Sequence, residues 1–366
     1  MQAVVFVKPY ELAIRTVPTP TLEAPTDAIV KVIVSAICGS DLHPYRGAEK
    51  GIVEGTRMGH EFVGTVVQVG ADVKRLAVGV RVCSPFTTNC GDCFYCAKGL
   101  TCRCEKGQLF GWVESGGHGL HGGQAGYVRV PLADATLVPV DDGMSDEHAL
   151  LLGDILSTGF YCAERAGLTK GGGDVAVVVG CGPVGLLAVA SACALGAAKV
   201  IAVDCVPERL ALARELGAAT VLDFTKDDVP AAVRAATEGR GADAVLEVVG
   251  AAPALRLAVD CLRPGGTLSS VGVHAYERMP FSPIDAYDKN ITFKAGRCPA
   301  RDVMARAQCA MLGPNAKADV TRIITHRLPI AEAVGAYKMF NAREDGAIKI
   351  LLYPEGGTGG GGGGGN

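Results

Sequence analysis

Four cysteines lie close together in the run CGDCFYCAKGLTCRC, namely Cys90, Cys93, Cys96 and Cys104. Cysteines separated by two residues can direct their thiolates at one centre, and Cys90, Cys93 and Cys96 have this spacing. With Cys104 after a short loop, the four can form a tetrahedral cage with Zn–S distances of about 2.3 Å. Four thiolates leave no open position, which is typical of a structural zinc. The alternative, cysteines that only pack or form disulfides, explains this spacing less well. Catalytic chemistry is therefore expected elsewhere in the chain.

A glycine-rich run, GCGPVG, follows the apolar stretch from Asp174 to Val179 and precedes a predicted helix. Its Gly180, Gly182 and Gly185 have the G-x-G-x-x-G spacing, which allows a tight turn, close approach of backbone to a pyrophosphate and close helix–strand packing. The phosphates would lie at the helix N-terminus, so Pro183 and Val184 in the same turn are counted with this site. The run predicts a dinucleotide site, although such turns also occur for steric reasons.

Asp204 ends the next predicted strand, KVIAVD. A carboxylate there can accept hydrogen bonds from the ribose hydroxyls of NAD, but it would repel the 2′-phosphate of NADP. The expected cofactor is therefore NAD. The alternative is a solvated aspartate at the end of a strand.

Composition is that of an ordinary globular protein. The chain has 366 residues with 49% hydrophobic content and a formal charge of −3. Its length favours two domains, and its charge gives no reason to expect nucleic acid or a membrane surface as a partner, so small molecules are the expected ligands. The N-terminus lacks a leader pattern and no long uncharged apolar run is present, which predicts a cytoplasmic protein. Its 14 cysteines fit a reducing compartment.

The chain has two styles of sequence. Short β-branched runs such as AIVKVIVSAI and FVGTVVQVG dominate the first part, whereas apolar strands alternate with amphipathic helices from about Gly171. The first style predicts a β-rich domain and the second a parallel sheet built from βαβ units. AIKILLY near the end is predicted to be a strand that returns to the first domain. The expected domains are residues 1–157 with 296–355 and an inserted domain at 158–295, followed by a flexible glycine-rich tail at 356–366.

Three further fragments complete the pattern: CGSDLH at residues 38–43, GHE at 59–61 and LLGDILSTGF at 151–160. Together with the four-cysteine run and the glycine-rich turn, they resemble the zinc-dependent medium-chain alcohol dehydrogenases over nearly the whole chain except its tail. The resemblance implies an α/β protein with a β-rich GroES-like catalytic domain and an inserted Rossmann domain with a doubly wound parallel sheet. It also implies one catalytic and one structural zinc per chain.

In this family the catalytic zinc ligands match Cys38, His60 and Asp154. The sequence departs from the Cys₂His set of other alcohol dehydrogenases because an aspartate stands at the third position, a pattern that is similar to bacterial secondary-alcohol dehydrogenases. Glu61 resembles a residue that can approach the metal, and Asp41 a carboxylate that orients the ligating imidazole. Both can equally be ordinary polar neighbours.

Ser40 and His43 match the family's proton relay, which carries the hydroxyl proton of the alcohol toward solvent. The alternatives are a turn-capping hydroxyl and a surface histidine. On the cofactor side, the resemblance assigns Arg209 to the adenosine, Lys349 to the pyrophosphate, and Thr158 with Val249, Val271 and Val273 to nicotinamide and its ribose. Each of these can also be structural.

The predicted activity is reversible hydride transfer between a secondary alcohol and NAD, giving a ketone or aldehyde, in the manner of EC 1.1.1.1. A formaldehyde, polyol or amino-alcohol dehydrogenase on the same scaffold is the main alternative, and a non-catalytic binding protein is a remote one. By analogy with the family, the chain is expected to form a homodimer or homotetramer.

Overall fold

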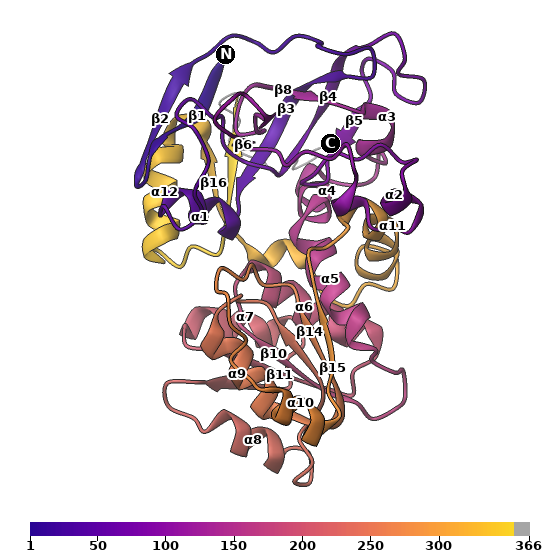
Figure 1. Ribbon diagram of the computed structural model, residues 1–366, viewed down its shortest axis with the longest axis vertical. Helices are drawn as coiled ribbons and strands as arrows, with labels where there is room; N and C mark the ends of the chain where they lie inside the picture. The colour runs from indigo at the N-terminus through magenta and orange to yellow at the C-terminus, as the bar shows by residue number, and fades with distance from the viewer. Residues whose placement is uncertain (355–366) are drawn as a thin grey trace, which may run out of the picture. The chain divides into compact units, whose positions relative to one another are not determined.

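The structure is a computed structural model that describes residues 1–354. Contacts divide it into two units (Figure 1). Unit 1 consists of Met1–Asp154, Pro299–Asp302 and the chain from Ile324 onward; unit 2 consists of Ile155–Cys298 and Val303–Ile323. Most of unit 2 therefore lies between two stretches of unit 1 along the chain. The predicted tail at 356–366 lies outside the described residues.

One part of the predicted domain division is wrong. Residues 303–323 were expected in the first domain but belong to unit 2. Helix α11 (Ala300–Met311) begins in unit 1 and continues into unit 2, and the 3₁₀ turn η3 (Val320–Ile323) packs against α6 (Pro183–Leu195). The segment has no βαβ pattern, and this is why the sequence did not assign it to the nucleotide-type domain.

Unit 1 is built on a seven-stranded sheet whose main path has the order β16-β17-β3-β4-β5-β9, with β8 also paired to β3. Strand β3 is the predicted run AIVKVIVSAI, and β17 pairs with it antiparallel, which confirms that the chain returns to this unit. In Figure 1 the yellow C-terminal strands accordingly lie beside the indigo part of the sheet. The strands are β3 (Ala28–Ile37), β4 (Phe62–Val69), β5 (Arg81–Cys83), β8 (Tyr127–Val130), β9 (Val138–Pro139), β16 (Ile324–Pro329) and β17 (Lys349–Tyr353).

Two small hairpins and several short helices complete unit 1. One apolar cluster buries side chains of β3 and β4 and is rich in valine, and a second buries side chains of β17 and of α12 (Ala333–Ala342) and is rich in aromatic, leucine and alanine side chains. The hairpins are β1 (Gln2–Lys8) with β2 (Glu11–Thr16), and β6 (Trp112–Val113) with β7 (Gly119–Leu120). The other helices are η1 (Gly39–Asp41), α1 (Leu42–Tyr45), α2 (Phe94–Ala97), η2 (Thr101–Arg103), α3 (Ala133–Thr136), α4 (Asp146–Gly153) and η4 (Ile330–Glu332).

Unit 2 has a six-stranded, all-parallel sheet in the order β12-β11-β10-β13-β14-β15. This is the doubly wound order, in which the strand sequence reverses between β10 and β13. The central strand β10 is VAVVV and is buried along its whole length, as expected for a strand covered on both faces. The strands are β10 (Val175–Val179), β11 (Lys199–Asp204), β12 (Thr220–Asp223), β13 (Ala242–Glu247), β14 (Leu262–Ser270) and β15 (Thr292–Ala295).

Helices cover this sheet, and α6 is buried along most of its length because its sequence is almost entirely apolar. Gly196 ends α6 with φ +105°, a left-handed conformation that glycine adopts without steric cost. The other helices are α5 (Ile155–Ala166), α7 (Pro207–Glu215), α8 (Val229–Ala235), α9 (Ala252–Cys261) and α10 (Pro283–Lys289).

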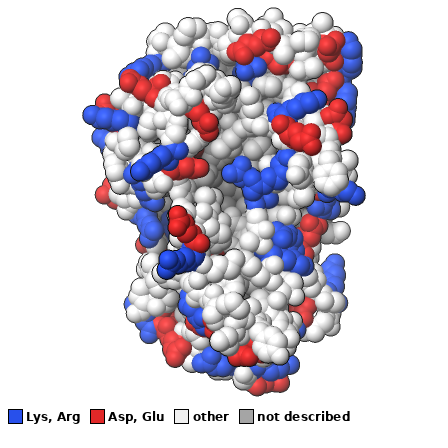
Figure 2. Space-filling view, in the orientation of Figure 1, with Lys and Arg blue, Asp and Glu red and all other residues white. Residues whose placement is uncertain are grey.

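The surface carries both signs of charge. Figure 2 shows basic and acidic side chains interspersed on the displayed face, with uncharged surface between them. Within residues 1–354, no helix is both long and apolar enough to span a bilayer.

Candidate metal centres and dinucleotide site

Three buried side chains of unit 1 converge on one point: Cys38, His60 and Asp154. Cys38 directly follows β3, His60 precedes β4, and Asp154 ends α4. The ligand atoms all lie within 4.8 Å of one another. The Asp154 carboxylate oxygen Oδ2 is 3.5 Å from Cys38 Sγ and 3.2 Å from His60 Nε2. Tetrahedral zinc with bonds of about 2.0–2.3 Å separates its ligand atoms by about 3–4 Å, so this donor set fits zinc.

The charge around these groups also suits a cation. Burial raises the pKa of the Cys38 thiol, and the negative charges of Glu61 and Asp154 raise it further. Burial opposes protonation of His60, but Asp41 and Cys38 outweigh it and raise the pKa of the imidazole. The site is thus electronegative, and a bound cation would stabilise both thiolate and carboxylate.

Asp41 orients the imidazole of His60. Its Oδ1 is 3.1 Å from His60 Nδ1, while its Oδ2 accepts a hydrogen bond of 2.9 Å from the backbone N–H of Cys38. A proton on Nδ1 leaves the Nε2 lone pair directed at Asp154 and Cys38, which is the arrangement that a metal-ligating histidine requires. One carboxylate therefore fixes two of the three candidate ligands.

Two residues that support Asp41 were missed by the sequence analysis, Gln124 and Tyr337. The Gln124 side-chain amide donates to Ala36 O at 2.9 Å and to Asp41 Oδ2 at 3.4 Å, and its Oε1 accepts a bond of 2.9 Å from the Tyr337 hydroxyl. Gln124 and Tyr337 are fully buried. A buried glutamine after a Gly-Gly pair was the available signal, but no local pattern connects it to Asp41.

Ser40 lies at the metal centre, with its Oγ 3.2 Å from His60 Nε2. His43 is half-buried in α1, and burial lowers its pKa. Among residues 1–354 the structure has no direct hydrogen bond between Ser40 and His43, so proton transfer from one to the other requires a bridging hydroxyl or water.

Glu61 and Lys349 form a fully buried ion pair in unit 1. Lys349 Nζ also donates to Ile37 O at 3.2 Å, and Glu61 Oε1 is buried without a hydrogen-bond partner in the described residues. The resemblance assigned Lys349 to the pyrophosphate, whereas the structure buries its ammonium group against Glu61, beside the metal centre. The unpartnered Glu61 oxygen is consistent with a carboxylate that can turn toward a cation.

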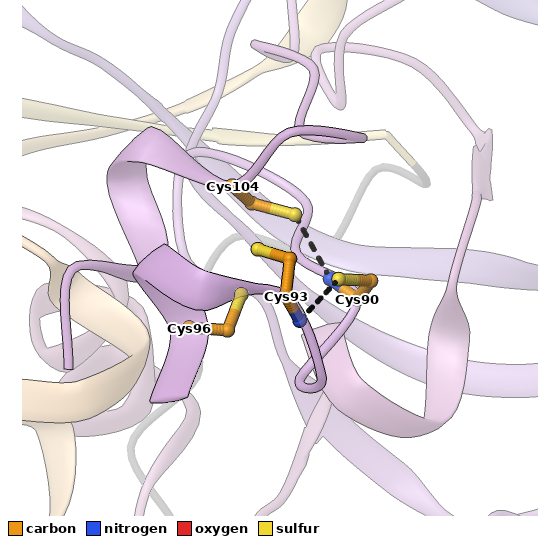
Figure 3. Close-up of side chains that lie close together, drawn as sticks. All are labelled: Cys90, Cys93, Cys96 and Cys104. Carbon is orange, nitrogen blue, oxygen red and sulfur yellow. Dashed lines mark hydrogen bonds between the residues drawn. The ribbon is translucent and has the colours of Figure 1, made fainter. Parts of the chain in front are cut away.

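The four cysteines of the other predicted site also converge (Figure 3). Cys90 and Cys93 precede α2, Cys96 lies within it, and Cys104 follows η2. Backbone N–H groups point at the sulfurs: Cys90 N–H donates to Cys104 Sγ at 3.2 Å and Cys93 N–H to Cys90 Sγ at 3.4 Å. Hydrogen bonds from the Cys96 and Glu105 backbone lower the pKa of Cys93 to about 6. The group has the donors and the backbone support of a closed zinc site.

The glycine-rich turn of unit 2 follows β10 and begins α6. Gly180 has φ +96°, and a Cβ at Gly185 would lie 1.8 Å from the Gly180 carbonyl oxygen, so both positions require glycine. Gly182 is the N-cap of α6 and has open space where a Cβ would be, while Pro183 is its first residue and Val184 its second. The turn therefore offers an open helix N-terminus at the point where the strand order reverses, which is where α/β proteins bind dinucleotides.

Asp204 is linked directly to this turn. Its Oδ2 accepts the Cys181 N–H at 2.7 Å, and its Oδ1 accepts the N–H groups of Cys205 and Val206 at 2.8 and 3.0 Å. It holds the end of β11 against the glycine-rich turn, so it is not merely a solvated aspartate. Arg209 lies half-buried in the first turns of α7, and Thr158 half-buried in α5.

The predicted nicotinamide contacts lie on two adjacent turns after β13 and β14. Val249 is 48% exposed and Val273 49% exposed, unusual for valines, and Val271 is half-buried. A Cβ at Gly250 would lie 2.4 Å from Val273 O, so the two turns are in close contact. They present exposed apolar surface beside the glycine-rich turn, since Gly180 faces Val249.

A hydrogen-bond network that was not predicted from sequence fixes these turns, and it joins the buried Glu247 and Ser270 to the exposed His274. Glu247 Oε1 accepts the N–H groups of Val249 and Gly250 at 2.9 and 2.8 Å, and Oε2 accepts the Ser270 hydroxyl at 2.6 Å. Ser270 Oγ is also 2.8 Å from His274 Nε2. Because Ser270 donates its single proton to Glu247, His274 Nε2 must be the donor in the second bond. The network positions both turns.

Comparisons with known proteins show which family and fold the chain resembles. The family model described as "Alcohol dehydrogenase GroES-like domain" matches residues 24–142, and the family model described as "Zinc-binding dehydrogenase" matches residues 183–308. The chain is 44% identical to zinc-type alcohol dehydrogenase B of Aspergillus flavus, covering 93% of this chain and 79% of that protein. It resembles the structure of alcohol dehydrogenase TADH from Thermus sp. ATN1 with a TM-score of 0.89 and 38% identity, covering 96% and 99% of the two chains. A putative zinc-binding dehydrogenase from Sinorhizobium meliloti 1021, bound to NADP, has a TM-score of 0.82 and 26% identity, covering 96% and 99%.

Proposed function

Because the chain belongs to the zinc-dependent medium-chain alcohol dehydrogenase family, we propose that this oxidoreductase transfers hydride from a secondary alcohol to NAD at the Cys38–His60–Asp154 centre. The observation that carries the proposal is that these three side chains are buried in unit 1 and that their ligand atoms lie close together. The carboxylate at the third ligand position supports a secondary alcohol, by its similarity to the bacterial secondary-alcohol enzymes.

The residues of unit 1 have separable tasks. Cys38, His60 and Asp154 would hold the catalytic zinc, with Asp41 fixing the imidazole. Zinc bound there would supply the Lewis acidity that favours loss of the alcohol's hydroxyl proton near neutral pH. Ser40, whose Oγ is 3.2 Å from a ligand nitrogen, is placed to accept that proton. A bridging hydroxyl or water would carry it from Ser40 to His43, which would release it to solvent. Phe86, which meets the His60 ring edge-on at a centroid distance of 6.4 Å, adds an apolar wall beside the centre.

The residues of unit 2 would bind the dinucleotide, which supplies the hydride acceptor. Gly180, Gly182 and Gly185 shape the pyrophosphate turn, and Val249 and Val273 offer apolar surface to nicotinamide. Asp204 supports NAD over NADP because a carboxylate at the end of this strand would repel the 2′-phosphate of NADP. The NADP-bound relative makes this preference the part of the proposal that most needs a direct test.

A substrate and cofactor panel tests the proposal. Purified enzyme would be assayed for NADH or NADPH formation with primary alcohols, secondary alcohols, polyols, amino alcohols and formaldehyde. The proposal expects the highest kcat/KM with a secondary alcohol and NAD. A preference for formaldehyde or a polyol would assign the chain to a different substrate class, and higher kcat/KM with NADP would overturn the role of Asp204. No turnover with any alcohol would support a binding protein instead.

The assembly follows the family analogy, and the 14 cysteines support a reducing compartment. We place the enzyme in the cytoplasm as a homodimer or homotetramer with two zinc ions per chain. Light scattering after size-exclusion chromatography gives the mass in solution, and a monomer would contradict the assembly.

A further inference from the structure

Unit 1 contains a cavity of about 290 Å³ that none of the candidate zinc ligands lines. It lies among the loop after β2, the segment before His60 and the β7–β8 connection. We call it the Arg57 cavity; its polar lining side chains are Thr19, Thr21, Glu23, Arg57, His121 and Arg129. Its volume is close to the lower end of the range for small-molecule sites.

The basic groups of the cavity are not equally neutralised. Arg129 Nη1 is 3.0 Å from Asp27 Oδ2, and its Nη2 is 3.0 Å from Glu23 Oε2. Two carboxylates thus satisfy Arg129. The Arg57 guanidinium, by contrast, has neither a hydrogen bond nor an ion pair with any of residues 1–354, although burial lowers its pKa. The cavity lining therefore has two guanidinium groups against one carboxylate, Glu23, and within residues 1–354 Arg57 is the one without an ion-pair partner.

His121 adds a neutral donor beside this charge. Its Nδ1 accepts a hydrogen bond of 3.2 Å from the Arg57 backbone N–H. Nδ1 must then carry a lone pair, so the ring proton is on Nε2. Burial, together with the charges of Arg57 and Arg129, lowers the pKa of His121 to about 4, and the ring stays neutral at pH 7.

We propose that the Arg57 cavity binds a small organic carboxylate, held by the guanidinium of Arg57 and the Nε2–H of His121. Arginine recognises planar carboxylates through two parallel hydrogen bonds. One guanidinium that pairs with no carboxylate of residues 1–354 matches a monoanion better than a phosphate dianion, whose second charge would face Glu23. The volume leaves room for a short carbon chain on the carboxylate.

The cavity is connected to the metal centre through the backbone. Gly122 N–H donates to Arg57 O at 2.8 Å, and Gly123 N–H donates to Gly59 O at 2.9 Å, directly before His60. A Cβ at Gly122 would lie 2.1 Å from Gly59 O, so these segments are tightly paired. A carboxylate at Arg57 would therefore bind against the segment that carries a zinc ligand, in a cavity that Cys38, His60 and Asp154 do not line.

Isothermal titration calorimetry of the zinc-loaded enzyme tests the proposal, with acetate, butanoate and inorganic phosphate titrated at constant ionic strength against chloride. We expect butanoate to bind and Arg57→Gln to weaken its binding at least about tenfold, because a charge-assisted bidentate contact is lost. Arg57→Lys should bind with intermediate affinity. The matched control is Arg75→Gln, an exposed arginine of the same unit, which should bind as the wild type does.

Three results would overturn the proposal: no carboxylate binding to the wild type, equal binding to Arg57→Gln, or binding of phosphate in preference to both carboxylates. A change of oligomeric mass in Arg57→Gln, without anion binding by the wild type, would assign Arg57 to a subunit interface. If Arg57→Gln does not fold, NMR titration of the wild-type enzyme decides. Saturating butanoate should raise the pKa of His121, and an unchanged pKa refutes the site.

Discussion

Substitution of Asp41 by asparagine should weaken zinc binding at the candidate catalytic centre while leaving the ligands themselves in place. The carboxylate accepts two strong hydrogen bonds, one from His60 Nδ1 at 3.1 Å and one from the Cys38 backbone N–H at 2.9 Å. Asparagine has only one acceptor oxygen. If its oxygen faces His60, its amide N–H₂ must face the Cys38 N–H, which is a donor against a donor. Either orientation loses one of the two contacts.

The expected loss follows from the role of such partners in metal sites. Removing a hydrogen-bond partner of a ligating histidine lowers metal affinity by about 10–100-fold, which corresponds to about 1.4–2.7 kcal/mol. Because Asp41 holds two ligands, we expect a value toward the upper end. Turnover at limiting zinc should fall by a similar factor and recover as zinc is added.

Competition with a zinc chelator of known affinity measures this loss. The four-cysteine site serves as an internal reference, because Asp41 is not among its donors. The control variant is Asp134→Asn, whose carboxylate accepts the backbone N–H groups of Lys74 and Arg75 outside both metal sites. Unchanged affinity in Asp41→Asn would refute the orienting role, and equal loss of both zinc ions would indicate general unfolding instead.

Three further predictions concern other parts of the molecule. Gly185→Ala places a Cβ 1.8 Å from Gly180 O, so denaturant unfolding should show a free energy of unfolding lower by about 1–3 kcal/mol, and dinucleotide affinity should fall as well. The control Gly335→Ala in α12 has open space around its Cβ and should not destabilise the protein. Equal effects of the two substitutions would contradict the close turn. Cys93→Ser should lose one zinc and chiefly impair folding, and a stable variant with full metal content would disprove the structural site. The pKa of His121 is lowered to about 4 in the folded protein, so between about pH 6.5 and pH 4 the unfolded chain binds a proton that the folded chain excludes. The contribution of His121 to the free energy of unfolding should therefore be lost as the pH falls through this range. His121→Gln should flatten the pH dependence of the free energy of unfolding there.

The elements whose periodicity was strong were predictable from the sequence. AIVKVIVSAI is β3 from end to end, and KVIAVD is β11 from end to end. The alternation of strand and helix gave the parallel sheet of unit 2, because βαβ units require crossover connections. Residues 303–323 were misassigned since neither a period nor a turn signal marks the unit to which they belong.

The site residues that were predictable are those that stand in short motifs of metal-ligating or glycine residues. Cys38, His60 and Asp154 were named through the family resemblance, and the structure explains their convergence by the end of β3, the approach to β4 and the end of α4. Gln124, Tyr337 and the Glu247–Ser270–His274 network were missed because their bonds join segments that are distant in sequence. Lys349 is the converse case: the family resemblance assigned it to the pyrophosphate, whereas its buried ammonium group pairs with Glu61 and donates to Ile37 O.

The central claim is that Cys38, His60 and Asp154 hold a zinc ion that is needed for turnover and not for folding. Metal analysis of wild-type enzyme and Asp154→Ala, with NADH binding measured on the same samples, tests it most directly. We predict two zinc ions per chain in the wild type and one in the variant, with NADH affinity retained and alcohol oxidation abolished. A variant that keeps two zinc ions, or that keeps its turnover with one, would contradict the claim.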